Sequence, residues 1–395
     1  MIREAAAKPG LGLAVGHGWD FTGVDRQALH GPSMPDEQPP PRPRDDASML
    51  EQLMSGSLVG ILLPHLNPLL NMSRLLTTDT ELAWEEGDHE RILSNLATML
   101  GMARHTRETP IMINSMVGVS FVSMACTQTL DLLHRDPERF TRAELTQLAH
   151  LLASADALVQ PMFEGERMFM MDTLQRLYGP HGRVTLSGLQ VLLSIAGPHG
   201  EDPVTGALAT PVGLPAAAML IAPRDEMERE FDRFMSMLQA EMARPPWERL
   251  HAMRTDDAVL DLAGNELSRI RYMPVIALMP ALSSGLRTSD RTLALRDAAL
   301  TVIAMELHRR DHGTYPRSVT DLSPHYMPQP PLDMATGQPL RLRLTDDDGF
   351  ILWLNGEDNG GVLSEDGERR WPGPERTGDW VLYPPVIRDA ESADD

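Results

Sequence analysis

Apolar side chains recur at helical spacing along most of the first three quarters of the chain. Between residues 48 and 178 they return every three or four positions, as Ile92, Leu96 and Met99 do. This period places them on one face of an α-helix. A further helix is expected at about 157–177. Short connections between such segments predict an antiparallel bundle or an array of helical hairpins.

One helix start is marked by its own residues. Thr141-Arg142-Ala143-Glu144 has the pattern of a capping box, in which the threonine hydroxyl and the glutamate carboxylate accept hydrogen bonds from backbone amides of the first turn. Leu145, Leu148 and Leu152 then form an apolar stripe. The sequence therefore predicts a helix that begins directly after Thr141.

The helical signal weakens and then returns in the middle of the chain. Residues 179–223 are dense in Gly and Pro, which predicts a loop around a short helix at 186–196. Helix is expected again at 224–243, followed by two helical segments at about 262–286 and 290–312.

A different pattern begins after Gly313. Residues 340–344 alternate apolar and charged side chains, and residues 350–354 form a short apolar run. The acidic, glycine-ended turn at 346–349 lies between them, which predicts a β-hairpin. Residues 381–383 are a candidate third strand.

These patterns divide the chain into three expected parts. Residues 1–46 are rich in Gly and Pro and are expected to be poorly ordered. Residues 47–286 are expected to form an α-helical domain, and residues 287–395 an α+β module with an acidic disordered tail. The expected fold class is mainly α, with a helical bundle or array followed by a long helix and a short antiparallel sheet.

Charge and hydropathy narrow the classes of partner. Lys and Arg number 35 and Asp and Glu number 56, which gives a formal net charge of −21. Such a chain repels phosphate backbones, so no nucleic-acid binding is expected. Residues 1–18 lack the pattern of a signal peptide, and the apolar stretches at 59–70 and 275–282 are too short to span a bilayer. The chain is therefore expected to be soluble, with its single cysteine, Cys126, as a small core residue.

The last quarter of the chain carries an ordered set of short motifs. A long helix runs into Gly313-Thr314-Tyr315-Pro316, followed by Pro331-Leu332-Asp333, Thr336-Gly337 and finally Gly378-Asp379-Trp380. This succession resembles the globular domain of the major pseudopilin of type II secretion. The helical part contains Glu85-Glu86-Gly87-Asp88, Leu100-Gly101-Met102-Ala103-Arg104-His105 and Pro245-Pro246-Trp247. In these segments it more loosely resembles large uncharacterised bacterial proteins, common in planctomycete-like bacteria, that join a helical region to this module.

The resemblance has one clear departure. A pseudopilin carries its module directly after an N-terminal apolar helix, whereas here no such helix is readable and the module begins near Asp290. Assembly into a pseudopilus by the usual route is therefore not expected. Members of the larger group often begin with a membrane anchor, which leaves open that this chain has a truncated or misassigned start.

The resemblance implies a calcium site in the loop after the second strand. Carried over position by position, Asp358 and Asn359 stand where paired acidic ligands lie, Asp379 where a later ligand lies, and the Leu354 carbonyl as a further contributor. The loop is shorter than in the family and one acidic position is Asn, so weaker binding is expected. The alternative is a plain solvated acidic loop.

No motif of nucleophilic or phosphate-binding chemistry meets its structural requirements, so an enzyme is the less favoured expectation. His308 and His312 have the spacing of a metal pair on a helix, but their place at a helix C-terminus also explains them. We expect a non-enzymatic structural or protein-interaction role at the cell envelope, related to secretion if the resemblance holds. An enzyme with a site between helices and a cytoplasmic helical scaffold that binds peptides are the alternatives.

Overall fold

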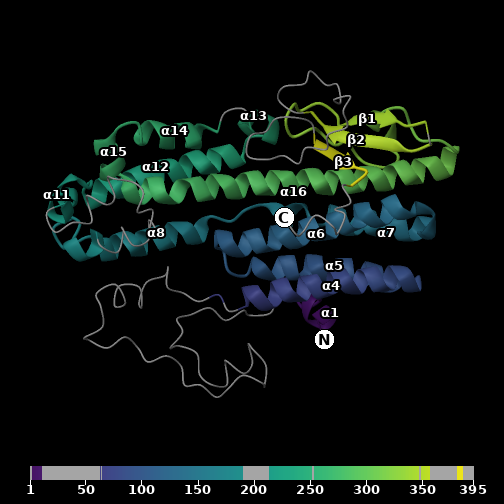
Figure 1. Ribbon diagram of the computed structural model, residues 1–395, viewed down its shortest axis with the longest axis horizontal. Coiled ribbons are helices and arrows are strands. Elements are labelled where there is room, and N and C mark those ends of the chain that lie inside the picture. Colours follow the sequence, from purple (N-terminus) through teal and green to yellow (C-terminus); the bar gives the residue numbers. More distant parts are fainter. Residues whose placement is uncertain are drawn as a thin grey trace, which may run out of the picture.

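The computed structural model of the chain describes residues 2–10, 63, 65–189, 213–250, 253–346, 348–355 and 380–385. Its elements, labelled as in Figure 1, are α1 (Ile2–Ala6), α4 (Leu66–Glu86), α5 (His89–Thr106), α6 (Met112–Arg135), η3 (Pro137–Arg139), α7 (Arg142–Ala153), η4 (Asp156–Val159), α8 (Glu164–Leu177), α11 (Gly213–Leu220), α12 (Arg224–Met242), α13 (Pro246–Leu250), α14 (Arg254–Leu262), α15 (Glu266–Arg271), α16 (Met273–His312), η5 (Val319–Leu322), β1 (Arg341–Leu344), β2 (Phe350–Leu354) and β3 (Trp380–Tyr383). The expected class, mainly helical with a small antiparallel sheet near the C-terminus, is confirmed.

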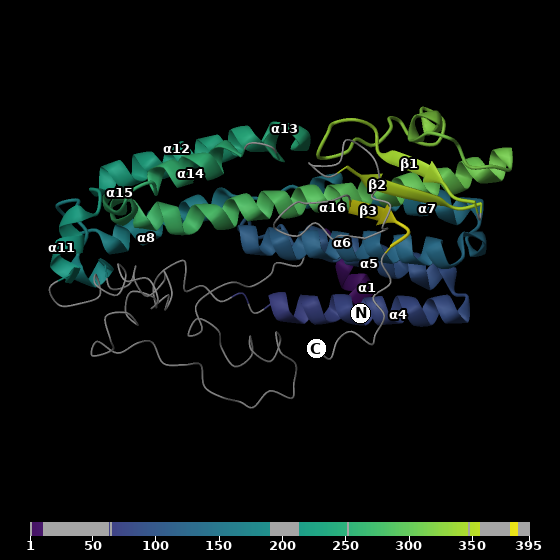
Figure 2. The same cartoon turned by 45° about the horizontal axis from the view of Figure 1, so that its top comes forward.

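The helix α16 runs through the middle of the molecule. It has 40 residues, which corresponds to about 60 Å at the rise of an α-helix. In Figures 1 and 2 it lies between a layer containing α6, α7 and α8 and an opposite layer containing α12, α14 and the sheet. Helices α5 and α4 extend the first layer outward, and α1 lies against them.

The sequence predicted a break in this helix near residues 287–289, and that prediction was wrong. The structure continues as one helix through Arg287, Thr288 and Ser289. The hydroxyl of Thr288 donates to the Ser284 carbonyl (3.0 Å), and that of Thr292 donates to the Thr288 carbonyl (3.1 Å). Polar side chains thus occur here inside a helix rather than in a linker.

The buried apolar residues form two clusters that share α16. The first core comes from α1, α4–α7, the C-terminal half of α16 and the sheet, and includes Phe121, Leu148 and Val302. The second core comes from α8, α11, α12, α14 and the N-terminal half of α16, and includes Phe231 and Leu282. The sheet therefore shares its core with the N-terminal bundle, and the expected boundary at 286/287 lies within a continuous helix.

Local signals fixed several element ends as expected. The Thr141 hydroxyl accepts from the Glu144 amide (3.3 Å), and the Thr141 amide donates to the Glu144 carboxylate (2.6 Å), so the capping box is confirmed. The left-handed conformation of Gly313, with φ of 79°, ends α16. Cys126 is buried in the first core, where burial raises the pKa of its thiol to about 12.

The sheet is antiparallel, with the order β1-β2-β3. Leu344 pairs with Phe350 across the hairpin, and Leu354 pairs with Trp380 at the far end of β2. The hairpin and the third strand are thus confirmed. Phe350 stacks on Tyr383 (ring centroids 4.8 Å apart) and meets the edge of Tyr315 (4.9 Å), which attaches the sheet to the segment after α16.

One helix among the described residues, α6, is long and apolar enough to cross a membrane by length and composition. However, 61% of its most apolar window is buried inside the protein. It packs between α5 and α16 (Figure 1), which is the place of a core helix in a bundle.

A buried ion pair joins α13 to the centre of α16. Arg249 Nε donates to Asp290 Oδ2 (2.9 Å), and a second hydrogen bond joins Nη2 to Oδ1. Arg249 also donates to the Glu241 carbonyl (3.2 Å) at the end of α12. The side chains are 7% and 1% exposed. Burial raises the pKa of Asp290, and the guanidinium opposes that shift.

Removing Asp290 is expected to leave a buried, unpaired guanidinium. The Asp290→Ala variant should lower the free energy of unfolding by about 3–5 kcal/mol, the usual result of removing one partner of a buried pair. Urea unfolding followed by circular dichroism measures this. Asp225→Ala, which breaks the exposed pair with Arg229, is the control and should leave the midpoint nearly unchanged. If the two variants lowered the free energy of unfolding equally, Asp290 would not be part of a buried ion pair.

Candidate functional site

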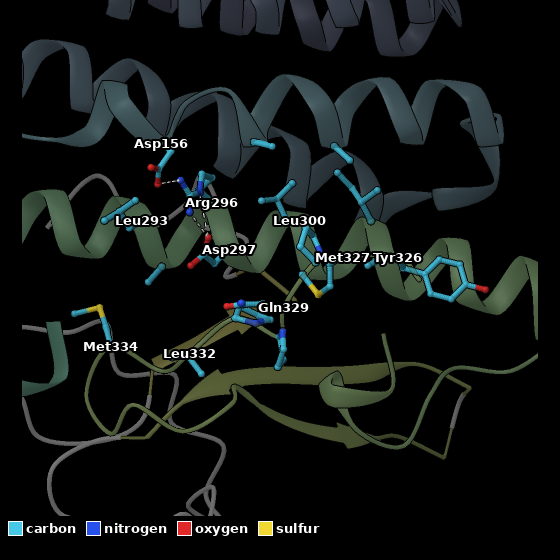
Figure 3. Close-up of a pocket in the computed structure, with 18 of the residues that line it drawn as sticks. Asp156, Leu293, Arg296, Asp297, Leu300, Tyr326, Met327, Gln329, Leu332 and Met334 are labelled. Carbon is cyan, nitrogen blue, oxygen red and sulfur yellow. Dashed lines mark hydrogen bonds and ion pairs between the residues drawn. The ribbon is translucent and has the colours of Figure 1, made fainter. Parts of the chain in front are cut away.

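A groove runs along the C-terminal half of α16. It has a volume of about 630 Å³ and lies between α7, α13, α16 and the loop before β1. That volume is within the range of small-ligand sites, about 300–1,000 Å³. Figure 3 shows α16 crossing the view, with Asp156 and Arg296 on one side and the loop residues Gln329, Leu332 and Met334 on the other.

The lining of the groove is mostly apolar. Leu293, Leu300 and Ile303 of α16 line it together with Met327 and Leu332 of the loop. Leu332 remains 39% exposed, unlike the leucines of the two cores. The remaining lining residues are Ala149, His150, Ala153, Asp156, Pro246, Trp247, Asp290, Ala294, Arg296, Asp297, Ala304, Leu307, Tyr326, Pro328, Gln329, Pro330, Pro331 and Met334.

A charged group lies at the α7 side of this apolar lining. Arg296 donates from Nε (3.0 Å) and Nη2 (2.7 Å) to Asp297 Oδ1, and from Nη1 to Asp156 Oδ1 (2.5 Å). Burial raises the pKa of Asp297, and the charge of Arg296 opposes this shift. Arg296 already has two carboxylate partners, so it is poorly placed to accept a further anion. Asp290 is already paired with Arg249. The other charged groups at this edge are the carboxylates of Asp156 and Asp297 and the guanidinium of Arg296.

The loop over the groove is held at its C-terminal end by Asp333, which is fully buried. Asp333 Oδ1 accepts from the Ala335 amide (2.7 Å), and Oδ2 accepts from the Asn355 amide (2.8 Å) at the end of β2. The Gly337 amide donates to the Asp333 carbonyl (2.8 Å). These bonds make a tight turn and attach it to the sheet.

The loop is held at its other end by Tyr326. The Tyr326 hydroxyl donates to Asp311 Oδ2 (2.8 Å), and Arg142 Nη2 of α7 donates to the same carboxylate oxygen (3.0 Å). Hydrogen bonds from Arg142 and Tyr326 hold the pKa of Asp311 at about 2. The groove wall is therefore fixed at both ends before any ligand arrives.

The described lining of the groove lacks the usual nucleophilic side chains. Among the lining residues that the structure describes there is no serine, threonine, cysteine or lysine, and His150 is the sole imidazole. A nucleophile within hydrogen-bond reach of a base is the usual requirement. The arrangement suits binding of an apolar group next to acidic side chains.

The predicted calcium ligands are only partly described. Leu354 is the last residue of β2, is buried, and pairs with Trp380, which follows Asp379 in the chain. Asp358, Asn359 and Asp379 lie outside the described residues. The Asn355 side-chain oxygen, beside Leu354, is buried and has no hydrogen-bond partner among the residues that the structure describes. No group of three or more His, Cys, Asp or Glu side chains in the described ranges is arranged to hold a metal ion.

Sequence reasoning did not find the groove. Its charged edge joins Asp156 to Arg296, which are 140 positions apart in the chain. In the sequence, Pro331-Leu332-Asp333 is a part of the resemblance to the pseudopilin domain, and nothing in its pattern indicates that it faces α16. A pattern of neighbouring positions cannot report such contacts.

Comparison of the chain with known protein families, with characterised proteins and with solved structures found no match. The geometry described above is therefore the basis for assigning a function.

Two glycines with left-handed backbones provide a matched test of the groove wall. A Cβ on Gly337 (φ 68°) would lie 2.9 Å from the indole ring of Trp247, whereas a Cβ on Gly313 (φ 79°) would meet nothing within 4 Å. Gly313→Ala is expected to cost about 1–2 kcal/mol of stability from backbone strain alone. Gly337→Ala should cost more, and should also shift tryptophan fluorescence because Trp247 must move. An unchanged spectrum would contradict the contact.

Proposed function

We propose that the chain is a non-enzymatic protein-interaction protein that binds a short segment of a partner protein in the groove along α16. The observation that carries the proposal is the apolar lining with two carboxylates and one guanidinium at its edge. A segment with apolar side chains and one lysine or arginine complements both features.

The shape of the groove favours an extended segment over a compact molecule. Its α16 wall runs from Asp290 to Leu307, which spans about 25 Å of helix. An extended peptide covers that length with about eight residues. The wall is fixed by hydrogen bonds at Tyr326 and Asp333, so binding need not order it, which preserves affinity.

The envelope location and the link to secretion remain part of this proposal. They rest on the resemblance of the last quarter of the chain to a pseudopilin domain. The long helix followed by an antiparallel sheet is compatible with that resemblance, but the sheet here shares its core with the N-terminal bundle. The described groove lining has no serine, threonine, cysteine or lysine side chain, so a binding role is proposed for it in preference to nucleophilic catalysis.

Calcium binding next to β2 is the second proposal. Calcium is bound by six to eight oxygen atoms, often including backbone carbonyls. Two observations favour a calcium site. The pairing of Leu354 with Trp380 brings the two ends of the candidate loop together. The side-chain oxygen of Asn355, which has no partner among the described residues, is a candidate ligand at that point. Asp358, Asn359 and Asp379 would supply the remaining side-chain ligands.

The groove proposal predicts that a charge at its exposed leucine abolishes binding. Peptides selected from a random display library on the full chain should combine apolar residues with Lys or Arg. Their binding, measured by fluorescence anisotropy, should be lost in Leu332→Asp. Leu344→Asp is the matched control, since Leu344 is 42% exposed on β1, compared with 39% for Leu332, and does not line the groove. Equal binding to both variants would exclude the groove.

The calcium proposal predicts a calcium-dependent melting temperature. A ligand at about one hundred times its dissociation constant adds roughly 2.7 kcal/mol to the folded state. The transition of the full chain should therefore rise in calcium relative to chelator, and Asp358→Ala and Asp379→Ala should abolish the gain. An unchanged transition at millimolar calcium would show that the loop is only a turn.

A further inference from the structure

Two histidines lie side by side at the C-terminal end of α16. His308 and His312 are one helical turn apart, and their ring centroids are 4.3 Å apart with planes tilted by 41°. His308 is partly exposed and His312 is exposed, so an ion can reach both from solvent. The groove does not include either residue.

A backbone carbonyl after α16 determines which nitrogen of the His308 ring carries a hydrogen. His308 Nδ1 lies 3.0 Å from the carbonyl oxygen of Thr314. A carbonyl oxygen only accepts, so Nδ1 must carry the proton and donate. In the neutral imidazole, Nε2 then holds a free lone pair. The left-handed turn at Gly313 makes this contact, because it folds Thr314 back onto the last turn of the helix.

This hydrogen bond is the usual companion of a metal-binding histidine. In metal sites the nitrogen that does not bind the ion commonly donates to a backbone carbonyl or a carboxylate, which orients the ring. A pair of histidines four residues apart on a helix also presents both imidazoles on one face. Stacking alone would explain the short ring separation without requiring the bond to Thr314.

We propose that His308 and His312 together bind one divalent transition-metal ion, with water in the remaining coordination positions. Two protein ligands are what the site offers, since no larger group of ligating side chains is arranged around it in the described part of the chain. Asp311 lies between the two histidines in sequence but is occupied by Arg142 and Tyr326. Its negative charge nonetheless offsets part of the charge of the bound ion.

The ligand type determines which ions bind. Imidazole nitrogen suits Cu²⁺, Ni²⁺ and Zn²⁺, whereas Mg²⁺ and Ca²⁺ prefer oxygen. The expected order of affinity has Cu²⁺ first, as for nitrogen sites in general. This site is therefore distinct in chemistry from the calcium loop proposed above, and an excess of Mg²⁺ should not displace the ion.

The neighbouring histidine provides the control. His325 is exposed and its ring lies 5.9 Å from that of Tyr326, but it is outside the helical pair. The chain has 13 histidines, so the measurement must be the change in bound ions per chain rather than the total.

The experiment is equilibrium dialysis of the full chain against Ni²⁺, Cu²⁺ and Zn²⁺ in turn, with excess Mg²⁺ present. His312→Ala, which removes an exposed side chain at the helix end, should lose one bound ion per chain, and His308→Ala should lose the same ion. His325→Ala should keep it. Circular dichroism confirms that each variant is folded. Retention of the wild-type stoichiometry by His312→Ala, or an equal loss in His325→Ala, would overturn the proposal.

Discussion

The structure depends on one constraint, which is that a single 40-residue helix must be covered along its whole length. Two different sets of helices cover the two halves of α16, so one element contributes to both cores. Polar residues buried along it need partners of their own, because an unsatisfied buried group costs about 1–3 kcal/mol. The Asp290 carboxylate accepts a hydrogen bond from Arg249, and the Glu306 carboxylate accepts hydrogen bonds from Tyr315 and Arg309. These partners determine where α13 and the segment before the sheet attach.

The groove follows from the same constraint. The sheet covers only part of the C-terminal half of α16, and the loop before β1 must pass beside the rest of it. Asp333 and Tyr326 fix the two ends of that loop, so it stays beside the helix without filling the space between them. A rigid wall with apolar side chains on both faces is suited to binding, since little conformational entropy is lost when a ligand enters.

The sequence correctly predicted those features of the fold that depend on residues close together in the chain. The capping box at Thr141, the end of α16 at Gly313 and the hairpin between β1 and β2 all arise from residues a few positions apart. The continuity of α16 was missed because Thr288 and Ser289 resemble a linker, while the ion pair at Asp290 that helps to hold the helix needs a partner 41 positions away. The division of the core and the groove were beyond prediction for the same reason.

Tyr326 connects the groove to the histidine pair. Its side chain lines the groove, and its ring meets the edges of His308 (centroids 5.5 Å apart) and His312 (6.5 Å). An ion bound by both histidines would draw their nitrogen atoms together and so change the surface on which Tyr326 rests. If that change alters the affinity of the groove, the groove ligand must alter the affinity for the ion by the same factor, because coupling between two sites is reciprocal. The hydrogen bond from Tyr326 to Asp311 opposes such coupling, since it holds the hydroxyl in place whichever site is filled.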